Sequence, residues 1–374
     1  MDPEIAPMYP LRFREVLRDY RFGNRWIVRE FEKTHLPDGH RVGETWEVCD
    51  RPGESSEIVN GPLAGRTLRE AIDANGADLL GGEIMDRFGG RFPLLIKLLD
   101  ATHTLSEQVH TNDRLTAERF PEEFCGKTEA WYMLRTASDA KVYAGPRARV
   151  TRGQLVNAVL ADRAAECMAE HPAKPGDAFL LYAGTMHYSP GGLLFYEIMQ
   201  NSDVYTSLKP PRRAGTEAER IAAARSAVEA VHLEDGFDCR THPVPLADGP
   251  NSRTFIFACQ HFALERLDLA GPARVGAPPR RFEVLTVIEG HADITGNGHT
   301  ERLAPGQSCL LPASLPDVTV TPAPTATVLR AYVPDLPRDI IAPLRAAGIA
   351  DPGIAALAGQ TRLNPLGRLL AAGR

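Results

Sequence analysis

Two stretches of the chain resemble each other, and this repeat constrains the fold more than any other feature. Residues 175–192 read PGDAFLLYAGTMHYSPGG, and residues 305–320 read PGQSCLLPASLPDVTV. Each begins with Pro-Gly, runs along a short apolar strand and turns through a corner of small residues. His187 follows this corner in the first copy, and Asp317 has the equivalent place in the second. The repeat predicts two similar β-units in one chain.

The amino-acid composition agrees with a fold of many short strands. The 374 residues include 30 prolines and 32 glycines without any low-complexity tract, which favours turns between strands. The hydrophobic fraction of 43% and the charged fraction of 24% are typical of soluble globular proteins. A net charge of −6 gives no basis for binding nucleic acid or an anionic membrane surface. We therefore expect neither partner.

The cysteines and the N-terminus predict a cytoplasmic location. The six cysteines are scattered and contain no CxxC pair, so we expect reduced thiols rather than disulfides. The first residues contain no apolar signal core, and no apolar run is long enough to span a bilayer. Nothing in the sequence distinguishes a monomer from an oligomer.

Local patterns predict the individual elements. Thr67 followed by Glu70 forms a capping-box pattern at the start of a helix. The helical pattern of residues 151–172 is expected to end at Pro172. Further helices are expected at residues 73–88, 114–124 and 215–232 and in the Ala- and Leu-rich tail after Pro337. Strands are expected at residues 26–31, 43–50, 56–65, 93–100 and 130–143 and through 255–333.

The repeat resembles the second sequence motif of the cupins, which are jelly-roll β-barrels. Gly176, Gly184 and His187 fit the motif in the first copy. In the second copy Ser314 and Asp317 replace the glycine and the histidine. The resemblance implies a metal histidine in the first barrel and no metal ligands in the second.

We therefore expect a mainly β fold of two cupin (jelly-roll) barrels, with helical insertions and a short helical C-terminal extension. The expected divisions are an N-terminal barrel with the metal site (1–212), a helical linker (213–250), a C-terminal barrel (251–336) and a helical tail (337–374).

A candidate metal site begins in the segment LSEQVH at residues 105–110. Side chains two apart on a strand share a face, so Gln108 and His110 are expected to point into the barrel together. Glu129 follows nineteen residues after His110, and His187 adds a second imidazole. Two imidazoles, a carboxylate and an amide suit Zn²⁺ with an open position. Two histidines and one carboxylate equally suit Fe²⁺ or another divalent metal.

Each of these residues also has an ordinary structural interpretation. A single inward-pointing histidine in a β-barrel is usually a hydrogen-bonded core residue, and a single glutamate is usually a surface acid. The combination with the cupin-like placement of His187 favours metal binding. The other histidines, His171 among them, have no partner at ligand spacing in the sequence.

Five segments together resemble the type I phosphomannose isomerases, which interconvert mannose 6-phosphate and fructose 6-phosphate. They occur in the family's order: GETWEV (43–48), PLLIKLLDATHTLSEQVH (93–110), GKTEAWY (126–132), PGDAFLLYAGTMH (175–187) and YEIMQNSDVY (196–205). The resemblance covers residues 9–213 and extends more loosely to about residue 333. It implies one zinc ion bound by Gln108, His110, Glu129 and His187.

The same resemblance implies the residues that act on the sugar. It places active-site residues at Lys97, Ser106 and Lys127, with Lys97 and Ser106 binding substrate and both lysines taking part in catalysis. Glu197 and Asp203 are further pocket acids, Glu197 catalytic and Asp203 substrate-binding. Glu197 has an alternative role in a structural hydrogen-bond network, and each lysine alone could be a solvated strand end.

The chain departs from the family pattern at three places. The family's arginine after the Ser-Asp pair, important for catalysis, is replaced by Ser207. Arg212 and Arg213 follow within six residues, and either can replace it; Arg213 is included among the candidate catalytic residues. Thr111 replaces a proline after QVH, and the tail from about Arg338 extends beyond short relatives.

The sequence leads to three hypotheses for function. The first is a zinc-dependent aldose–ketose isomerase that acts through a cis-enediol on mannose 6-phosphate or a related sugar. The second is a diverged cupin that binds metal and sugar with little or no isomerase activity, because Ser207 replaces the arginine. The third is an iron cupin oxygenase, which is disfavoured because Gln108 stands where iron sites usually have a second histidine.

Overall fold

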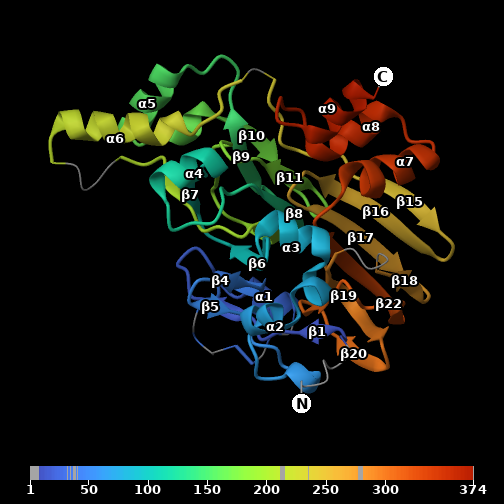
Figure 1. Ribbon diagram of the computed structural model, residues 1–374. Coiled ribbons are helices and arrows are strands. Elements are labelled where there is room, and N and C mark those ends of the chain that lie inside the picture. The colour runs from blue at the N-terminus through green and yellow to red at the C-terminus, as the bar shows by residue number, and fades with distance from the viewer. Residues whose placement is uncertain are drawn as a thin grey trace.

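Antiparallel β-sheets dominate the protein, as the turn-rich sequence predicts. The computed structural model describes residues 8–31, 33, 35–36, 39, 41–210, 215–234, 236–276 and 281–373. Figure 1 shows the strands of the C-terminal half, in orange and brown, on one side of the molecule. The strands in green and cyan, from the N-terminal half, lie beside them.

Two sheets come from the N-terminal half. The six-stranded sheet has the order β11-β8-β13-β6-β3-β2, and the five-stranded sheet has the order β10-β9-β12-β7-β14. The first contains β2 (Val16–Arg18), β3 (Glu44–Val48), β6 (Leu94–Ala101), β8 (Glu129–Thr136), β11 (Ala178–Leu181) and β13 (Leu193–Gln200). The second contains β7 (Leu105–Val109), β9 (Lys141–Pro146), β10 (Met168–Pro172), β12 (His187–Ser189) and β14 (Thr206–Ser207). A separate hairpin joins β4 (Asp50–Arg51) to β5 (Glu54–Ser55).

A nine-stranded sheet comes mainly from the C-terminal half. It contains β1 (Leu11–Arg12), β15 (Val244–Asp248), β16 (Asn251–Ala258), β17 (Ala263–Leu269), β18 (Ala273–Val275), β19 (Glu283–Gly296), β20 (His299–Leu303), β21 (Ser308–Leu311) and β22 (Val318–Tyr332). The N-terminal strand β1 joins this sheet by pairing with β21. β15 lies inside the stretch expected to be a linker. The division into two barrels with the expected boundaries stays a prediction.

The sequence repeat has a common backbone in both copies. Gly176 and Gly306, with φ of 88° and 77°, form the Pro-Gly turns before the four-residue strands β11 and β21. After the corner, His187 begins β12 and is buried. Asp317 is exposed and lies 3.7 Å from Arg274 in a surface ion pair. The two copies therefore share a turn and a strand but present different chemistry.

Helices lie at the margins of the sheets. Thr67 caps α2 (Leu68–Leu80) in a capping box with Glu70, which confirms that prediction. The described helices also include α1 (Trp26–Glu30), α3 (Gly82–Phe88), α4 (Asp113–Arg119), α5 (Arg152–Leu160) and α6 (Glu217–Glu229), with short 3₁₀ turns at Gly61–Leu63 and Ala164–Cys167. The expected helix at residues 215–232 is α6, and it packs against α5 (Figure 1).

The tail forms short helices, as expected. They are a π-turn (Leu336–Ile341), α7 (Ala342–Ala346), α8 (Asp351–Ala355), a 3₁₀ turn (Ala356–Ala358) and α9 (Pro365–Ala372). Figure 1 shows them near β15 and β16, and the 3₁₀ turn contacts β16. No helix among the described residues is long and apolar enough to cross a membrane.

Three local predictions are corrected. Residues 26–31 were expected to be a strand but form α1, because the Asp100 carboxylate accepts the Trp26 backbone N–H at 2.6 Å and Ile27 is buried on the helix. Residues 56–65 contain the 3₁₀ turn at Gly61–Leu63 rather than a continuous strand. Pro172 ends strand β10 rather than a helix, and an edge strand tolerates proline.

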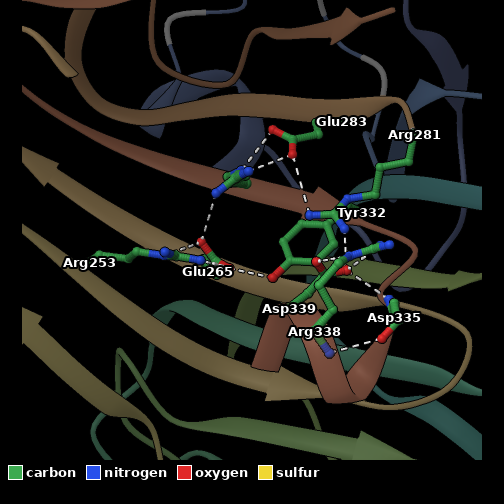
Figure 2. Close-up of polar contacts among 9 residues, drawn as sticks. Arg253, Glu265, Arg281, Glu283, Tyr332, Asp335, Arg338 and Asp339 are labelled. Carbon is green, nitrogen blue, oxygen red and sulfur yellow. Dashed lines mark hydrogen bonds and ion pairs between the residues drawn. The ribbon is translucent and has the colours of Figure 1, made fainter. Parts of the chain in front are cut away.

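Charged side chains form a buried network on one face of the nine-stranded sheet (Figure 2). Glu265 is two residues from Leu267 on β17, and Arg330 is two residues from Val328 on β22. Side chains two apart on a strand share a face, so Glu265 and Arg330 lie on the face that also carries the buried apolar residues Leu267 and Val328. Glu265 accepts two hydrogen bonds of 2.7 Å from Arg253 and one of 3.3 Å from Arg330. Figure 2 shows Tyr332 directed at Glu265, and Asp335, Arg338 and Asp339 of the tail beside Arg281. The network thus connects the tail to the sheet.

Candidate metal centre and active site

Three predicted metal ligands converge although they come from different strands. Glu129 begins β8, His187 begins β12, and His110 directly follows β7. Glu129 Oε2 lies 3.3 Å from His110 Nε2, and Glu129 Oε1 lies 3.2 Å from His187 Nε2. All three side chains are buried. Because metal–nitrogen and metal–oxygen bonds of about 2.0–2.1 Å place tetrahedral ligands roughly 3.3 Å apart, these donors are already at ligand spacing.

Backbone hydrogen bonds orient both imidazoles for metal binding. His110 Nδ1–H donates to Val204 O at 2.7 Å, and His187 Nδ1–H donates to Thr185 O at 2.9 Å. Each ring therefore presents the lone pair of Nε2 to the site, in the arrangement typical of metal-bound histidines. Burial lowers the pKa of His110 to about 4 and also lowers the pKa of His187. The imidazoles are consequently neutral near pH 7.

The site holds buried acceptor atoms without hydrogen-bond partners. Within the described part of the chain, His110 Nε2 and both carboxylate oxygens of Glu129 are buried and have no hydrogen-bond partner, although Lys127 Nζ forms an ion pair with Glu129 Oε2. Burial acts to raise the pKa of Glu129, but Lys127 and the two imidazoles outweigh it and hold that pKa well below its usual range. A buried carboxylate between two imidazole lone pairs needs a cation, so the residues fit a divalent metal ion.

Gln108 lies beside this triad. It is half-buried on β7 opposite His187, and its Nε2–H donates to His187 Nε2 at 2.9 Å. Rotation of the amide by a half-turn would exchange nitrogen for oxygen at this place and provide a fourth donor. The structure thus brings Gln108 to the site, and its role as a ligand stays a prediction.

A buried lysine between two glutamates forms the other half of the site. Lys97 Nζ lies 3.2 Å from Glu44 Oε2 and 3.3 Å from Glu197 Oε2. The indole N–H of Trp46 donates to Glu44 at 2.7 Å, and that of Trp131 donates to Glu197 at 2.9 Å. The lysine and both carboxylates are therefore fixed by partners on β3, β6, β8 and β13.

The charges shift the acid–base properties of this group. Burial acts to lower the pKa of Lys97, but the charges of Glu44 and Glu197 outweigh it and raise that pKa. Burial raises the pKa of Glu197 to about 7, although the Lys97 ammonium opposes the rise. Lys97 is thus a permanent cation, and Glu197 can exchange a proton near neutral pH.

One cavity of about 270 Å³ is lined by residues of both the metal triad and the Lys97 group. Its lining includes Lys97, Gln108, Lys127, Glu129, Glu197 and Asp203. Lys127 Nζ lies 3.1 Å from Glu129 Oε2, and both residues line the cavity. The aromatic rings of Tyr20 and Tyr205 are exposed and also line the cavity.

Some predicted residues lie elsewhere, and one was missed. Ser106 is exposed on β7 and does not line the cavity within the part of the chain described. Arg213 lies outside the described residues. Ser207, on β14, pairs with Gln108 on β7. Glu44 is a site residue that the sequence analysis missed, although it lies in the family segment GETWEV (43–48). Its contact with Lys97 depends on the pairing of β3 with β6, which the segment alone does not reveal.

Gly126 lets the backbone that leads to Lys127 and Glu129 pack closely against residues 111–113. A Cβ at Gly126 would lie 2.5 Å from the carbonyl carbon of Asn112 and 2.6 Å from the carbonyl oxygen of Thr111, which accepts the Lys127 N–H. We expect Gly126→Ala to cost about 1–3 kcal/mol of unfolding free energy and to weaken metal binding, because backbone must move at the site. Thermal unfolding and metal titration measure both effects.

Gly153 provides the matched control for this substitution. It lies on α5, and a Cβ there would meet no atom of the described residues within 4 Å beyond the backbone of its own helix. Gly153→Ala is expected to stabilise the protein by about 0.5–1 kcal/mol and to leave metal binding unchanged. Equal metal affinity in the Gly126→Ala protein and the wild type would contradict the proposed close packing.

Two sequence-family models match this chain. Residues 11–149 match "Phosphomannose isomerase type I, catalytic domain". Residues 251–333 match "Mannose-6-phosphate isomerase, cupin domain". The first match contains Gln108, His110 and Glu129, and the second lies within the nine-stranded sheet.

Similar proteins of known name cover most of the chain. Mannose-6-phosphate isomerase ManA of Bacillus subtilis is 30% identical over 308 residues, which is 82% of this chain and 94% of that protein. The putative mannose-6-phosphate isomerase YvyI of the same organism is 30% identical over 283 residues, which is 75% of this chain and 86% of that protein. A crystal structure of mannose 6-phosphate isomerase from Bacillus subtilis has a TM-score of 0.74 and 26% identity, covering 87% of this chain and all of that one.

Proposed function

Because the chain belongs to the type I mannose-6-phosphate isomerase family, we propose that it is a zinc-dependent enzyme that interconverts mannose 6-phosphate and fructose 6-phosphate or a related aldose–ketose pair. The observation that carries the proposal is that Glu129, which belongs to the His110–Glu129–His187 triad, lines the same cavity as the Lys97–Glu197 pair. Metal binding alone would not require the second group.

The metal would be held by Gln108, His110, Glu129 and His187. When bound, Zn²⁺ supplies a Lewis acid that polarises the oxygens of the open-chain sugar. The donor set of two neutral imidazoles, a carboxylate and an amide suits zinc, which would accept the substrate as a fifth ligand. Lys127, at 3.1 Å from Glu129, holds that carboxylate ionised and directed to the imidazoles.

The proton transfer is assigned to Glu197. Its carboxylate would take the proton from C2 of the aldose and return it to C1, while a proton passes from the C2 hydroxyl to the C1 oxygen. A pKa of about 7 suits both steps, because the group is then neither too weak a base nor too weak an acid. Lys97, a permanent cation at 3.3 Å, would stabilise negative charge on the enediolate oxygens.

The remaining assignments concern substrate binding. Asp203 lines the cavity and would accept hydrogen bonds from sugar hydroxyls. Ser106 lies on the same face of β7 as Gln108 and would contact the substrate at the edge of the site. Arg213 would supply the cation that Ser207 lacks, and Arg213→Ala is expected to lower turnover more than metal content.

Metal analysis of the purified protein, combined with an isomerase assay, tests this proposal. Mannose 6-phosphate is supplied first, and unphosphorylated mannose is supplied alongside it. One zinc ion per chain and conversion of mannose 6-phosphate to fructose 6-phosphate are expected. Zinc without turnover of either sugar would contradict the isomerase and would support the alternative, a metal- and sugar-binding cupin, which the replacement of the arginine by Ser207 favours.

The pH dependence of the reaction should report the ionisation of Glu197. We expect kcat/KM to rise between about pH 5 and about pH 9 with an inflection near 7, because the base must be deprotonated to accept the C2 proton. Lys97 lowers the pKa of Glu197, so Lys97→Met should move the inflection to higher pH as well as reduce kcat. Lys141→Met, at an exposed lysine, is the control and should leave the profile unchanged. An unshifted inflection in Lys97→Met would exclude Glu197 as the titrating base.

A further inference from the structure

A second group of side chains of the types that bind metals lies outside the cavity. His171 is on β10, and Asp238 and Cys239 lie on the segment that precedes β15. One nitrogen of His171, a carboxylate oxygen of Asp238 and the sulfur of Cys239 all lie within 4.8 Å of one another. His171 and Asp238 are half-buried and Cys239 is fully buried. His171 is far from the adjacent pair Asp238 and Cys239 in sequence, so the fold brings the histidine to them.

A hydrogen bond sets which nitrogen of His171 is free to bind a metal. His171 Nε2–H donates to Ala144 O at 3.1 Å, which leaves the lone pair on Nδ1. Nδ1 lies 3.9 Å from Asp238 Oδ1, which itself accepts the Arg240 backbone N–H at 2.9 Å. His171 Nδ1 and Asp238 Oδ1 are thus two acceptors near a buried thiol, and 38% of the Asp238 side chain is exposed. A cation between these two atoms would be attracted by both.

We propose that His171, Asp238 and Cys239 bind a second metal ion, of the zinc type, with water as the fourth ligand. Imidazole nitrogen, carboxylate oxygen and thiolate sulfur are ligands that Zn²⁺ accepts together. Bonds of about 2.0–2.3 Å need donors roughly 3.3–3.7 Å apart, so donors that lie up to 4.8 Å apart would approach by up to about 1.5 Å. The His171 N–H bonded to a backbone carbonyl is the usual outer contact of a metal-bound histidine.

The position of this site indicates a structural role. Asp238 exchanges two backbone hydrogen bonds of 2.8 Å with Gln360 in the tail. His171 belongs to the five-stranded sheet, through the pairing of β10 with β9. An ion shared by His171 and Asp238 would therefore tie the tail to that sheet. This inference does not depend on the isomerase activity.

Loading the full-length protein with cobalt(II) tests the inference. The protein is stripped with a chelator, dialysed against metal-free buffer, titrated with Co²⁺ and measured by absorption and by metal analysis. A thiolate ligand produces a sulfur-to-cobalt charge-transfer band, which the oxygen and nitrogen donors of the first site cannot produce. We expect two ions per chain and this band in the wild type. Cys239→Ala and His171→Gln should each bind one ion and lack the band.

Two further variants complete the experiment. Cys309→Ala removes another fully buried thiol and should keep both ions and the band. Glu129→Gln disables only the first site and should retain the band, so failure of the proposed function and failure of this inference can be distinguished. One ion per chain and no band in the wild type would overturn the proposal. His171 and Asp238 would then share a proton instead of a metal.

Discussion

The Glu129→Gln protein is expected to lose its catalytic metal ion and almost all isomerase activity. The substitution preserves shape but removes the negative charge between two imidazoles and Lys127, which lie 3.1–3.3 Å from the carboxylate. Outer contacts of metal sites alone contribute about 10–100-fold to metal affinity, so loss of a charged ligand should weaken binding by at least about 100-fold. Metal titration and the isomerase assay measure the two losses.

The control for this prediction is Glu170→Gln. Glu170 is an exposed glutamate on β10 that pairs with Lys141, and its replacement should change neither metal content nor turnover. Excess zinc should partly restore activity to Glu129→Gln, because the two imidazoles stay oriented by Val204 and Thr185. Full activity of Glu129→Gln in metal-free buffer would rule out the metal centre.

Glu265→Ala is expected to cause the largest loss of stability of any single substitution discussed. Glu265 is fully buried and accepts hydrogen bonds from Arg253, Arg330 and the Tyr332 hydroxyl. Its removal leaves two guanidinium groups with fewer counter-charges, and breaking such a buried pair costs about 3–5 kcal/mol. Domains are typically stable by only about 5–15 kcal/mol, so the midpoint of denaturant unfolding should fall markedly.

Two comparisons separate this effect from loss of packing. Asp293→Ala disrupts an exposed pair with Arg302, at 3.7 Å, and should cost about 1 kcal/mol or less. Glu265→Gln keeps the size of the side chain but removes its charge, and should still lose much of the same stability. If Glu265→Ala unfolds at the same denaturant concentration as Asp293→Ala, the network does not stabilise the fold.

The predictions that succeeded rest on local geometry. The capping box of Thr67 and Glu70 needs only residues three apart, and the structure contains it. Gln108 and His110 are two residues apart, and both reach the triad, Gln108 at His187 and His110 at Glu129. The Pro-Gly turns of the repeat need a left-handed glycine, and Gly176 and Gly306 both adopt this conformation.

The errors and omissions have a common cause. Residues 26–31 contain β-branched side chains, but a carboxylate 74 residues away caps them as a helix. Glu44 meets Lys97 because β3 lies beside β6 in the sheet. His171 meets Cys239 because the chain returns to β10 from a distant segment. None of these partners is visible in a window of neighbouring residues.

The sequence by itself determined the β-rich class, the repeat, the family resemblance and the four candidate ligands. Turn chemistry and strand alternation act over a few residues, so both can be predicted from the local sequence. The tertiary structure alone decided which glutamates flank Lys97 and how close Glu129 stands to the two imidazoles. It also decided that an ion network connects the tail to the nine-stranded sheet. These depend on strand register, which the packing of the whole core selects rather than any local preference.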